Sequence, residues 1–308
     1  MTDPYGFLLL DKPQGWSSHR VVSRVRKWLG TRKVGHAGTL DPMATGLLVI
    51  GIGPATRLLT HAVGLDKAYS ATIRLGASTP TDDADSAPDR FAPAGAVADI
   101  DPDSLESALT ALRGDILQAP SAVSAIKVDG RRAYARVRAG EDVELAARPV
   151  TVSRFDVVSE LRAAHTEDDK GSGRPVLDVD VVVDCSSGTY IRALARDLGA
   201  ALGVHGHLTR LRRTRVGDYR VEDALAVPDF DTEAPLPSLV PAAQAAAGLL
   251  PVLPVTEDQA RDLRMGRRSP AAAPADEPRA AVSGDDLVAI VDLHEGEAAP
   301  RTVFPAHG

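Results

Sequence analysis

The run of residues 35–50, GHAGTLDPMATGLLVI, constrains this chain more than any other segment. Its three glycines allow tight bends and close approach of the backbone to another group. Pro42 disfavours a helix at Asp41 and restricts that residue to extended or turn geometry. The apolar residues 47–50 predict a short buried strand. We therefore expect one carboxylate on a stiff loop beside buried structure, where a reacting group can be aimed.

Asp41 also has an ordinary interpretation. Aspartate often caps turns, and turn chemistry explains an Asp-Pro pair without any catalysis. The residues around Asp41 do not decide between the two, so the rest of the chain has to.

Composition narrows the class of protein. The chain has 308 residues, of which 44% are hydrophobic, which favours a globular protein of two domains or one domain with an appendage. The single cysteine, Cys185, excludes an intrachain disulfide and a multi-cysteine zinc site and fits a reducing cytoplasm. No stretch reaches the roughly 18 apolar residues of a membrane span, and residues 7–10 are too short for a signal-peptide core.

The charge is unevenly distributed. The whole chain has a net charge of −7, but residues 221–308 alone carry −9, so the rest is slightly basic. Residues 12–57 and 192–220 are rich in Lys and Arg. Local basic surfaces, rather than the net charge, bind phosphates, although any single arginine is more simply explained as a solvated surface residue.

Hydrophobic periodicity and turn residues predict the elements. Strands are expected over 5–10, 46–51, 67–75, 123–128, 148–161 and 177–185. Helices are expected from residue 17 or 18 to about 29, over 54–64, 104–112, 131–138 and 189–202. Residues 77–103 and 164–174 are expected as polar loops, 226–250 as a Pro- and Ala-rich linker, and the tail as strands over 287–293 and 302–304 around a loop at 271–278.

The order Gly-His-Ala-Gly-Thr-Leu-Asp-Pro, followed by Ala44 and Gly46-Leu47-Leu48, resembles the catalytic loop of the bacterial tRNA pseudouridine-55 synthases of the TruB type. Four further segments resemble this family in the family's order. They are residues 11–18 (DKPQGWSS), 67–69 (KAY), 118–134, which resembles the thumb insertion, and 185–192 (CSSGTYIR) with the later Asp197-Leu198-Gly199 and Leu211-Arg212-Arg213.

The resemblance implies roles for four residues. Asp41 would be the nucleophile, Arg192 its ion-pair partner, Tyr69 the ring that stacks on the target base, and Leu211 part of the pocket wall. A nucleophilic carboxylate acts as the anion, which a neighbouring cation favours. By pattern alone Tyr69 is a core residue, Arg192 a surface ion pair and Leu211 simply apolar.

The resemblance also implies residues that contact RNA. These are Lys12, His36, Gly38, Thr39, Lys127, Arg131, Arg132, Arg212 and Arg213. By pattern alone His36 is a satisfied loop histidine, and the basic residues of 127–138 form a solvated helix face. His205 and His207 have the spacing of a metal pair, but no carboxylate or cysteine cluster accompanies them, so we expect no metal.

The family implies an α+β fold in which a mostly antiparallel central sheet carries the site, followed by a small PUA-like β domain. We expect a catalytic domain over 1–230 with a thumb at about 120–148, a linker over 231–249 and an RNA-binding domain over 250–308. The expected substrate is the T-arm stem-loop of tRNA. No cofactor, membrane or obligatory protein partner is expected, and the chain is expected to be a cytoplasmic monomer.

Two other functions stay open at this stage. The first is an RNA-binding or tRNA-folding chaperone on the same scaffold. The second is a nucleoside glycosidase, which would use paired carboxylates, whereas no second acid accompanies Asp41 in its loop.

Overall fold

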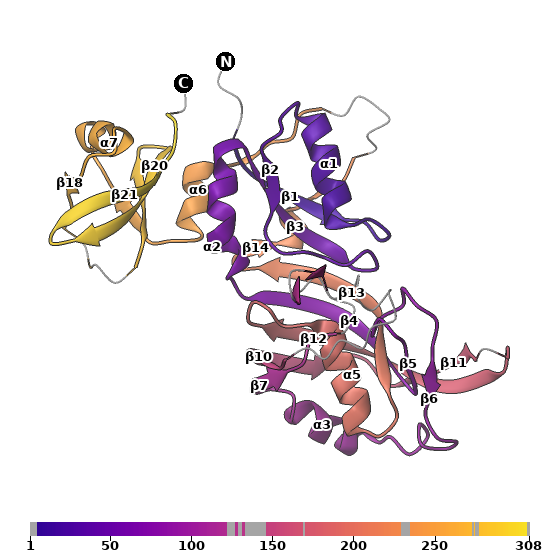
Figure 1. Ribbon diagram of the computed structural model, residues 1–308. Coiled ribbons are helices and arrows are strands. Elements are labelled where there is room, and N and C mark those ends of the chain that lie inside the picture. The colour runs from indigo at the N-terminus through magenta and orange to yellow at the C-terminus, as the bar shows by residue number, and fades with distance from the viewer. Residues whose placement is uncertain are drawn as a thin grey trace. The chain divides into compact units, whose positions relative to one another are not determined.

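The computed structural model describes residues 5–121, 127–128, 131–132, 146–168, 170–228, 235–272, 274 and 277–306 (Figure 1). The chain divides into two units that are described separately. The first unit comprises Met1–Asp41, Gly46–Leu65 and Arg215–Gly308, and the second comprises Pro42–Thr45 and Asp66–Thr214.

The first unit is built around two long antiparallel strands, β1 (Gly6–Lys12) and β3 (Thr45–Ile52), which pair from Gly6 with Ile52 to Lys12 with Gly46. These confirm the strands expected over 5–10 and 46–51. Three short strands extend the pair. β2 (Val34–His36) pairs with β3, whereas β15 (Leu225–Ala226) and β16 (Val240–Pro241) pair with β1.

Successive side chains of β1 and β3 point to opposite faces of the sheet, and since both sets are mostly apolar and buried, the sheet has two apolar faces. Helix α1 (Ser18–Trp28) covers one of them, since Val21, Val22 and Val25 join a buried cluster with Leu8 and Leu10. The side chain of Ser17 caps the helix by accepting from the N–H of Arg20. This confirms the helix expected to begin at residue 17 or 18.

The other face of β1 and β3 packs against short helices. η1 (Gly53–Leu58), α2 (Leu59–Val63) and α6 (Ala242–Ala247) contribute to one buried cluster with Phe7 and Val49. α2 and α6 lie side by side (Figure 1). The short β14 (Tyr219–Arg220) and η2 (Val221–Asp223) precede the segment expected as a linker. Part of that segment is not a linker but helix α6, whose Ala242, Ala245 and Ala246 are buried.

The end of the chain forms a five-stranded sheet in the order β17-β19-β20-β21-β18. Its strands are β17 (Val252–Pro254), β18 (Ser269–Pro270), β19 (Arg279–Ser283), β20 (Asp286–His294) and β21 (Glu297–Val303). Helix α7 (Glu257–Arg264) packs on the sheet and begins with a capping box between Thr256 and Gln259. This is the small C-terminal β domain that the sequence predicted, with more elements than expected.

The second unit carries strands in the order β13-β4-β12-β10-β7. They are β4 (Lys67–Leu75), β7 (Gly114–Gln118), β10 (Arg148–Val157), β12 (Gly173–Cys185) and β13 (Gly206–Val216), whose last two residues belong to the first unit. β12 is antiparallel to both β4 and β10. The α+β class with a mostly antiparallel sheet is thus confirmed.

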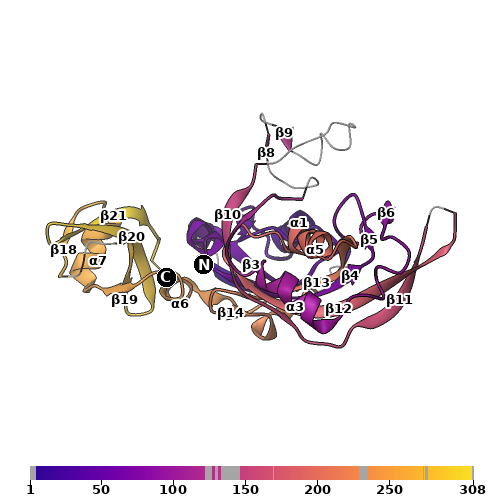
Figure 2. The ribbon, with the colours of Figure 1, turned by 90° about the horizontal axis from the view of Figure 1, so that it is seen from below.

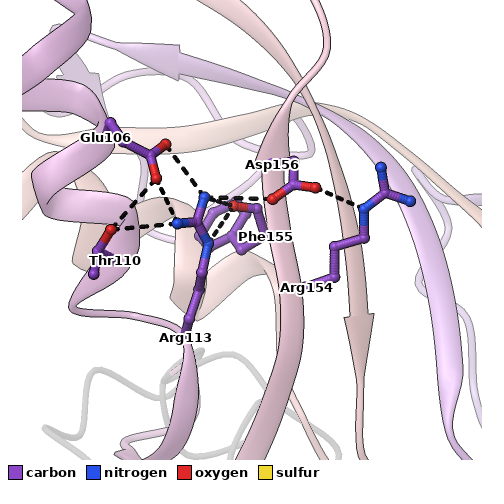
Figure 3. Close-up of polar contacts among 6 residues, drawn as sticks. All are labelled: Glu106, Thr110, Arg113, Arg154, Phe155 and Asp156. Carbon is purple, nitrogen blue, oxygen red and sulfur yellow. Dashed lines mark hydrogen bonds and ion pairs between the residues drawn. The ribbon is translucent and has the colours of Figure 1, made fainter.

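Two helices belong to this unit, α3 (Pro102–Thr110) and α5 (Ile191–Ala201). Arg113, just after α3, ties the helix to β10 (Figure 3). Its guanidinium pairs with Glu106 of α3 at 2.5 Å and donates to the carbonyl of Phe155 at 2.7 and 2.9 Å. The helix is therefore fixed to the strand by a charged side chain as well as by packing.

Three expectations for this unit were wrong. Residues 77–103 are not a loop throughout, because β5 (Ala77–Ser78) pairs with β6 (Arg90–Phe91). Residues 164–174 are not a loop, because β11 (Arg162–Glu167) pairs with the start of β12 as a projecting hairpin (Figure 2). Arg131 and Arg132 are not helical, because they form β9 (Arg131–Arg132), paired with β8 (Lys127–Val128). Residues 122–126, 129–130 and 133–145 lie outside the described residues. Across the described ranges, no helix is long and apolar enough to cross a membrane.

Candidate active site

The loop that leads to Asp41 is held by buried backbone contacts. The Oγ of the buried Ser18 accepts from the N–H of Leu40 at 2.9 Å and donates to the Leu40 carbonyl at 3.0 Å. The N–H of Ala37 donates to the carbonyl of Val49 at 2.9 Å. Gly38 has a φ of +90°, which favours glycine. Asp41 itself is half-buried and follows directly on this anchored segment.

Lys12 supports the turn before α1. It is fully buried, and its Nζ donates to the carbonyl of Trp16 at 2.6 Å and to that of Pro13 at 3.0 Å. A buried ammonium group needs such acceptors to offset its lost hydration. This geometry suits a structural role better than the direct RNA contact expected from the sequence.

The loop continues directly from Asp41 into the second unit, which begins with Pro42–Thr45. Within that unit the Oγ1 of Thr45 lies 3.5 Å from the carbonyl oxygen of Leu211, to which it donates. Arg212 donates from Nη1 to the Oγ1 of Thr45 at 3.4 Å. The segment after Asp41 is thus joined to β13 at the position where the sequence predicted Leu211 and Arg212.

Strand β4 contributes Tyr69, which is 8% exposed and lies opposite Val183 of β12. Two residues earlier, on the same face by the strand period, Lys67 lies opposite Cys185. Burial, and then the nearby charge of Arg213, lower the pKa of Lys67 to about 8. Burial raises the pKa of the Cys185 thiol to about 11, in keeping with the packing role expected for this cysteine.

Arg192 stands in the first turn of α5, and its guanidinium is buried. The start of the helix is fixed by Gln118, which accepts from the N–H of Tyr190 at 2.8 Å and donates to its carbonyl at 3.1 Å. The Nη1 of Arg192 donates to the carbonyl of Thr81 at 2.8 Å and lies 3.4 Å from Oδ2 of Asp83.

Asp83 is a site residue that the sequence reasoning missed. Its side chain is 2% exposed. Its Oδ1 accepts from Thr81 Oγ1 at 2.6 Å and from the N–H of Asp85 at 3.0 Å, which orients the carboxylate toward Arg192. The adjacent Thr and Asp residues of this loop are turn formers, and that was the only indication in the sequence. Nothing in the spacing points to α5.

Asp82 forms a second anchor for the same loop. Its carboxylate lies 3.5 Å from Nη1 of Arg196, and its carbonyl accepts from the N–H of Leu208. Desolvation raises the pKa of Asp82, partly offset by Ser121, Arg196 and Arg192. The segment expected as a plain polar loop therefore holds two arginines of α5 in place.

The remaining predicted residues fall as follows. His36 is half-buried, with its ring 6.0 Å from that of His19, and Thr39 is exposed. Arg213 is fully buried, which suits support of the site rather than direct contact with RNA. His207 is engaged through Nδ1 with the carbonyl of Ala77 at 2.8 Å, and burial lowers its pKa. Over the residues the structure describes, no group of three metal-ligating side chains comes together.

Comparison with known proteins gives a consistent result. The family described as TruB family pseudouridylate synthase (N terminal domain) matches residues 26–191, and the tRNA pseudouridylate synthase B C-terminal domain matches residues 192–234. The tRNA pseudouridine synthase B of Arthrobacter sp. (strain FB24) is 53% identical over 97% of this chain and 96% of its own length. That of Leifsonia xyli subsp. xyli is also 53% identical, over 98% and 97%.

Solved structures show the same fold at lower identity. The archaeal box H/ACA sRNP Nop10-Cbf5 complex contains a chain that superposes with a TM-score of 0.66 at 22% identity, covering 98% of this chain and 86% of that one. A chain of the Cbf5-Nop10-Gar1 complex gives 0.66 at 24% identity, over 97% and 84%.

Proposed function

Because this chain belongs to the TruB family of pseudouridylate synthases, we propose that it converts the uridine at position 55, in the T-loop of tRNA, to pseudouridine. The observation that carries this proposal is the 53% identity to tRNA pseudouridine synthase B relatives over nearly the whole chain. The domain boundaries expected from the sequence, at residues 230 and 250, are part of the proposal.

The reaction breaks the C1′–N1 bond of the uridine, turns the base, and joins C5 to C1′. The proton on C5 leaves and N1 gains one, so atoms and charge balance without an oxidant or a group donor. We assign Asp41 as the nucleophile that holds one fragment during the rotation. A base inside a folded loop has to be extruded to reach such a group.

The second unit supplies the other catalytic side chains of the proposal. Arg192, oriented by Asp83 and Thr81, is the cation assigned to keep Asp41 ionised. Tyr69 offers an aromatic face for the extruded uracil, and Leu211 forms apolar wall. A dry surrounding strengthens the charge interactions among these groups.

RNA contacts are assigned to seven members of the predicted set. His36, Gly38 and Thr39 lie on the loop before Asp41, and Arg212 lies on β13. Lys127, Arg131 and Arg132 belong to the β8–β9 hairpin inside the expected thumb. Lys12 and Arg213 are assigned a supporting role because both are buried.

The finer expectations complete the proposal. The chain is proposed to act in the cytoplasm, as a monomer, with no metal or organic cofactor and no obligatory protein partner. Because the purified chain is assayed alone, product formation also tests whether a cofactor or a protein partner is required.

The decisive variant is Asp41→Asn, assayed on unmodified tRNA transcript with pseudouridine mapped by position. The wild type should modify one T-loop uridine, and the variant should lose at least about 10³-fold in rate while binding tRNA within about twofold, because only the nucleophile is removed. Asp103→Asn, an exposed change in α3, serves as the control.

The same assay separates the rival function. A tRNA-folding chaperone would keep its activity in the Asp41→Asn variant, and both activities can coexist. Wild-type rates of pseudouridine formation from that variant would refute the role of Asp41, and release of free uracil would indicate a glycosidase.

A further inference from the structure

Helix α1 and the turn after it form a stretch without acidic residues. Residues 12–40 contain seven Lys or Arg and no Asp or Glu. Within α1, Arg20, Arg24 and Lys27 recur at the i, i+4, i+7 spacing, which places them along one face of the helix over about 10 Å. The opposite face, with Val21, Val22 and Val25, is buried on the sheet. The basic face is therefore held outward by the packing of the apolar face.

The cations on this face are accessible to a partner. Arg20, Lys27, Arg32 and Lys33 are exposed, and none of the four has an ion-pair partner among the described residues. Arg20 lies over the ring of Trp16 at 4.1 Å, and Trp16 is itself half-exposed. A guanidinium stacked on an indole is preorganised and keeps its donors available for an oxygen ligand.

A hollow lies at the end of this face. Thr31, Arg32 and Lys33 line a cavity of about 420 Å³, together with Gly53, Pro54 and Pro305. The two chain segments that line it are joined by a hydrogen bond from the N–H of Gly53 to the carbonyl of Lys33 at 2.7 Å. Positive side chains around a concave surface concentrate an anionic ligand.

In the C-terminal β domain, by contrast, exposed arginines are paired with carboxylates. Its exposed Arg267 and Arg268 pair with Asp262 and Glu297, and Arg264 pairs with Asp286. Each of these three guanidinium groups has a carboxylate beside it, in the part of the chain that carries the excess of acid. Phosphates approaching this domain therefore meet neutralised arginines.

From this contrast we propose that the α1 face, defined as Arg20, Arg24, Lys27, Arg32 and Lys33, binds the sugar-phosphate backbone of the tRNA, and that the C-terminal β domain contributes little to phosphate binding. This inference rests on the proposed function for the identity of the RNA. The contacts are electrostatic, so they position the substrate and carry no base specificity.

The test compares two double variants that change net charge equally. Arg20→Glu with Lys27→Glu alters the α1 face, and Arg267→Glu with Arg268→Glu alters the C-terminal domain. Binding of unmodified tRNA transcript is measured at several salt concentrations. The α1 variant should bind at least about tenfold more weakly, with a log K against log salt slope shallower by about 1.5, since each lost phosphate contact removes about 0.7 to 0.9. The C-terminal variant should stay within about twofold of the wild type.

Thermal unfolding of both variants shows that they are folded, and Arg20→Gln with Lys27→Gln should give an intermediate loss of affinity. Equal weakening by both double variants, or an unchanged slope in the α1 variant, would overturn the inference. The α1 variant should keep the wild-type kcat at saturating tRNA and raise KM. If the wild type makes no pseudouridine while the α1 variant still loses tRNA affinity, the proposed function fails and the α1 surface stands.

Discussion

The buried ammonium group of Lys67 makes the stability of the fold depend on pH. Its pKa falls to about 8 because of burial and the charge of Arg213. In the unfolded chain the pKa returns to about 10.4. Between these values the unfolded state binds more protons than the native state, so this residue makes stability rise with pH from about 8 to about 10.4, and its cost is fully present below pH 8.

This dependence can be measured by denaturant unfolding of Lys67→Met and the wild type between about pH 8 and about pH 10. The wild type should gain stability relative to the variant as pH rises from about 8 to about 10, because only the wild type has this titrating group. A difference that does not change with pH would contradict the pKa of the folded state.

Asp83 is predicted to be a positioning residue that acts through Arg192. Asp83→Asn keeps the shape of the side chain but removes the charge 3.4 Å from the guanidinium. We expect kcat to fall at least about tenfold with tRNA affinity nearly unchanged, and stability to fall by about 3 kcal/mol, as for a broken buried ion pair. Asp89→Asn, at an exposed position of the same segment, should have neither effect. A raised KM with normal kcat would argue against positioning.

The contrast between Asp41 and Asp83 shows how far residue-scale prediction reaches. Asp41 was found because the order of residues around it, Gly-His-Ala-Gly-Thr-Leu-Asp-Pro, resembles the catalytic loop of the TruB family. Asp83 escaped because its partner, Arg192, comes from a helix far along the chain, and only the tertiary structure brings the two together. Tyr69 and Leu211 are buried, as their apolar patterns alone would predict, so burial does not separate a catalytic role from a core role.

At the scale of elements, α5 and the start of β13 approach so closely that glycine is required. A Cβ on Gly199 would lie 2.1 Å from the carbonyl carbon of His205, and one on Gly206 would lie 2.5 Å from the carbonyl oxygen of Ala195. The clash involves backbone on both sides, which cannot move without shifting the helix that carries Arg192.

We therefore predict that Gly199→Ala destabilises the protein by about 3 kcal/mol or more, although alanine normally stabilises a helix by about 1 kcal/mol relative to glycine. Ala200→Gly at the next, exposed position should cost only about 1 kcal/mol. Denaturant midpoints of both variants provide the measurement. A neutral or stabilising Gly199→Ala would show that the helix and strand are farther apart than the structure places them.

Elements with one buried face were predicted well, and elements exposed on both faces were not. The alternating valines of 177–185 predicted the buried end of β12, and α1 was predicted from its three valines and Ser17 cap. The β11 end of the hairpin is mostly exposed, so its sequence lacks the period of two and reads as a loop.

At the scale of the molecule, composition marked an acidic, Pro- and Ala-rich change near residue 226 and suggested a separate tail. The structure joins the two ends of the chain in one unit. Tyr5 donates from its hydroxyl to the carbonyl of Pro305 at 2.8 Å, and Arg57 donates to the carbonyl of Val303 at 2.7 Å. No local pattern indicates contacts at such separation, because each partner is a backbone carbonyl.

Phe304 tests whether these contacts make the C-terminal β domain a support for β1. Its side chain is 1% exposed and shares one buried cluster with Phe7, Val49 and Leu58. Phe304→Ala should cost about 3 to 5 kcal/mol, the usual cost of such a cavity. Thr302→Ala, two residues earlier on β21, should cost less than about 1 kcal/mol.

Hydrogen exchange then locates the loss. If the cluster couples the two ends of the chain, Phe304→Ala should reduce amide protection in β1 and β3 as well as in β20 and β21, because elements that share a core open together. Reduced protection confined to β20 and β21 would mean that the C-terminal domain folds without support from β1. In that case β1 and β3 would owe their stability to their own pairing and to packing against α1, η1, α2 and α6.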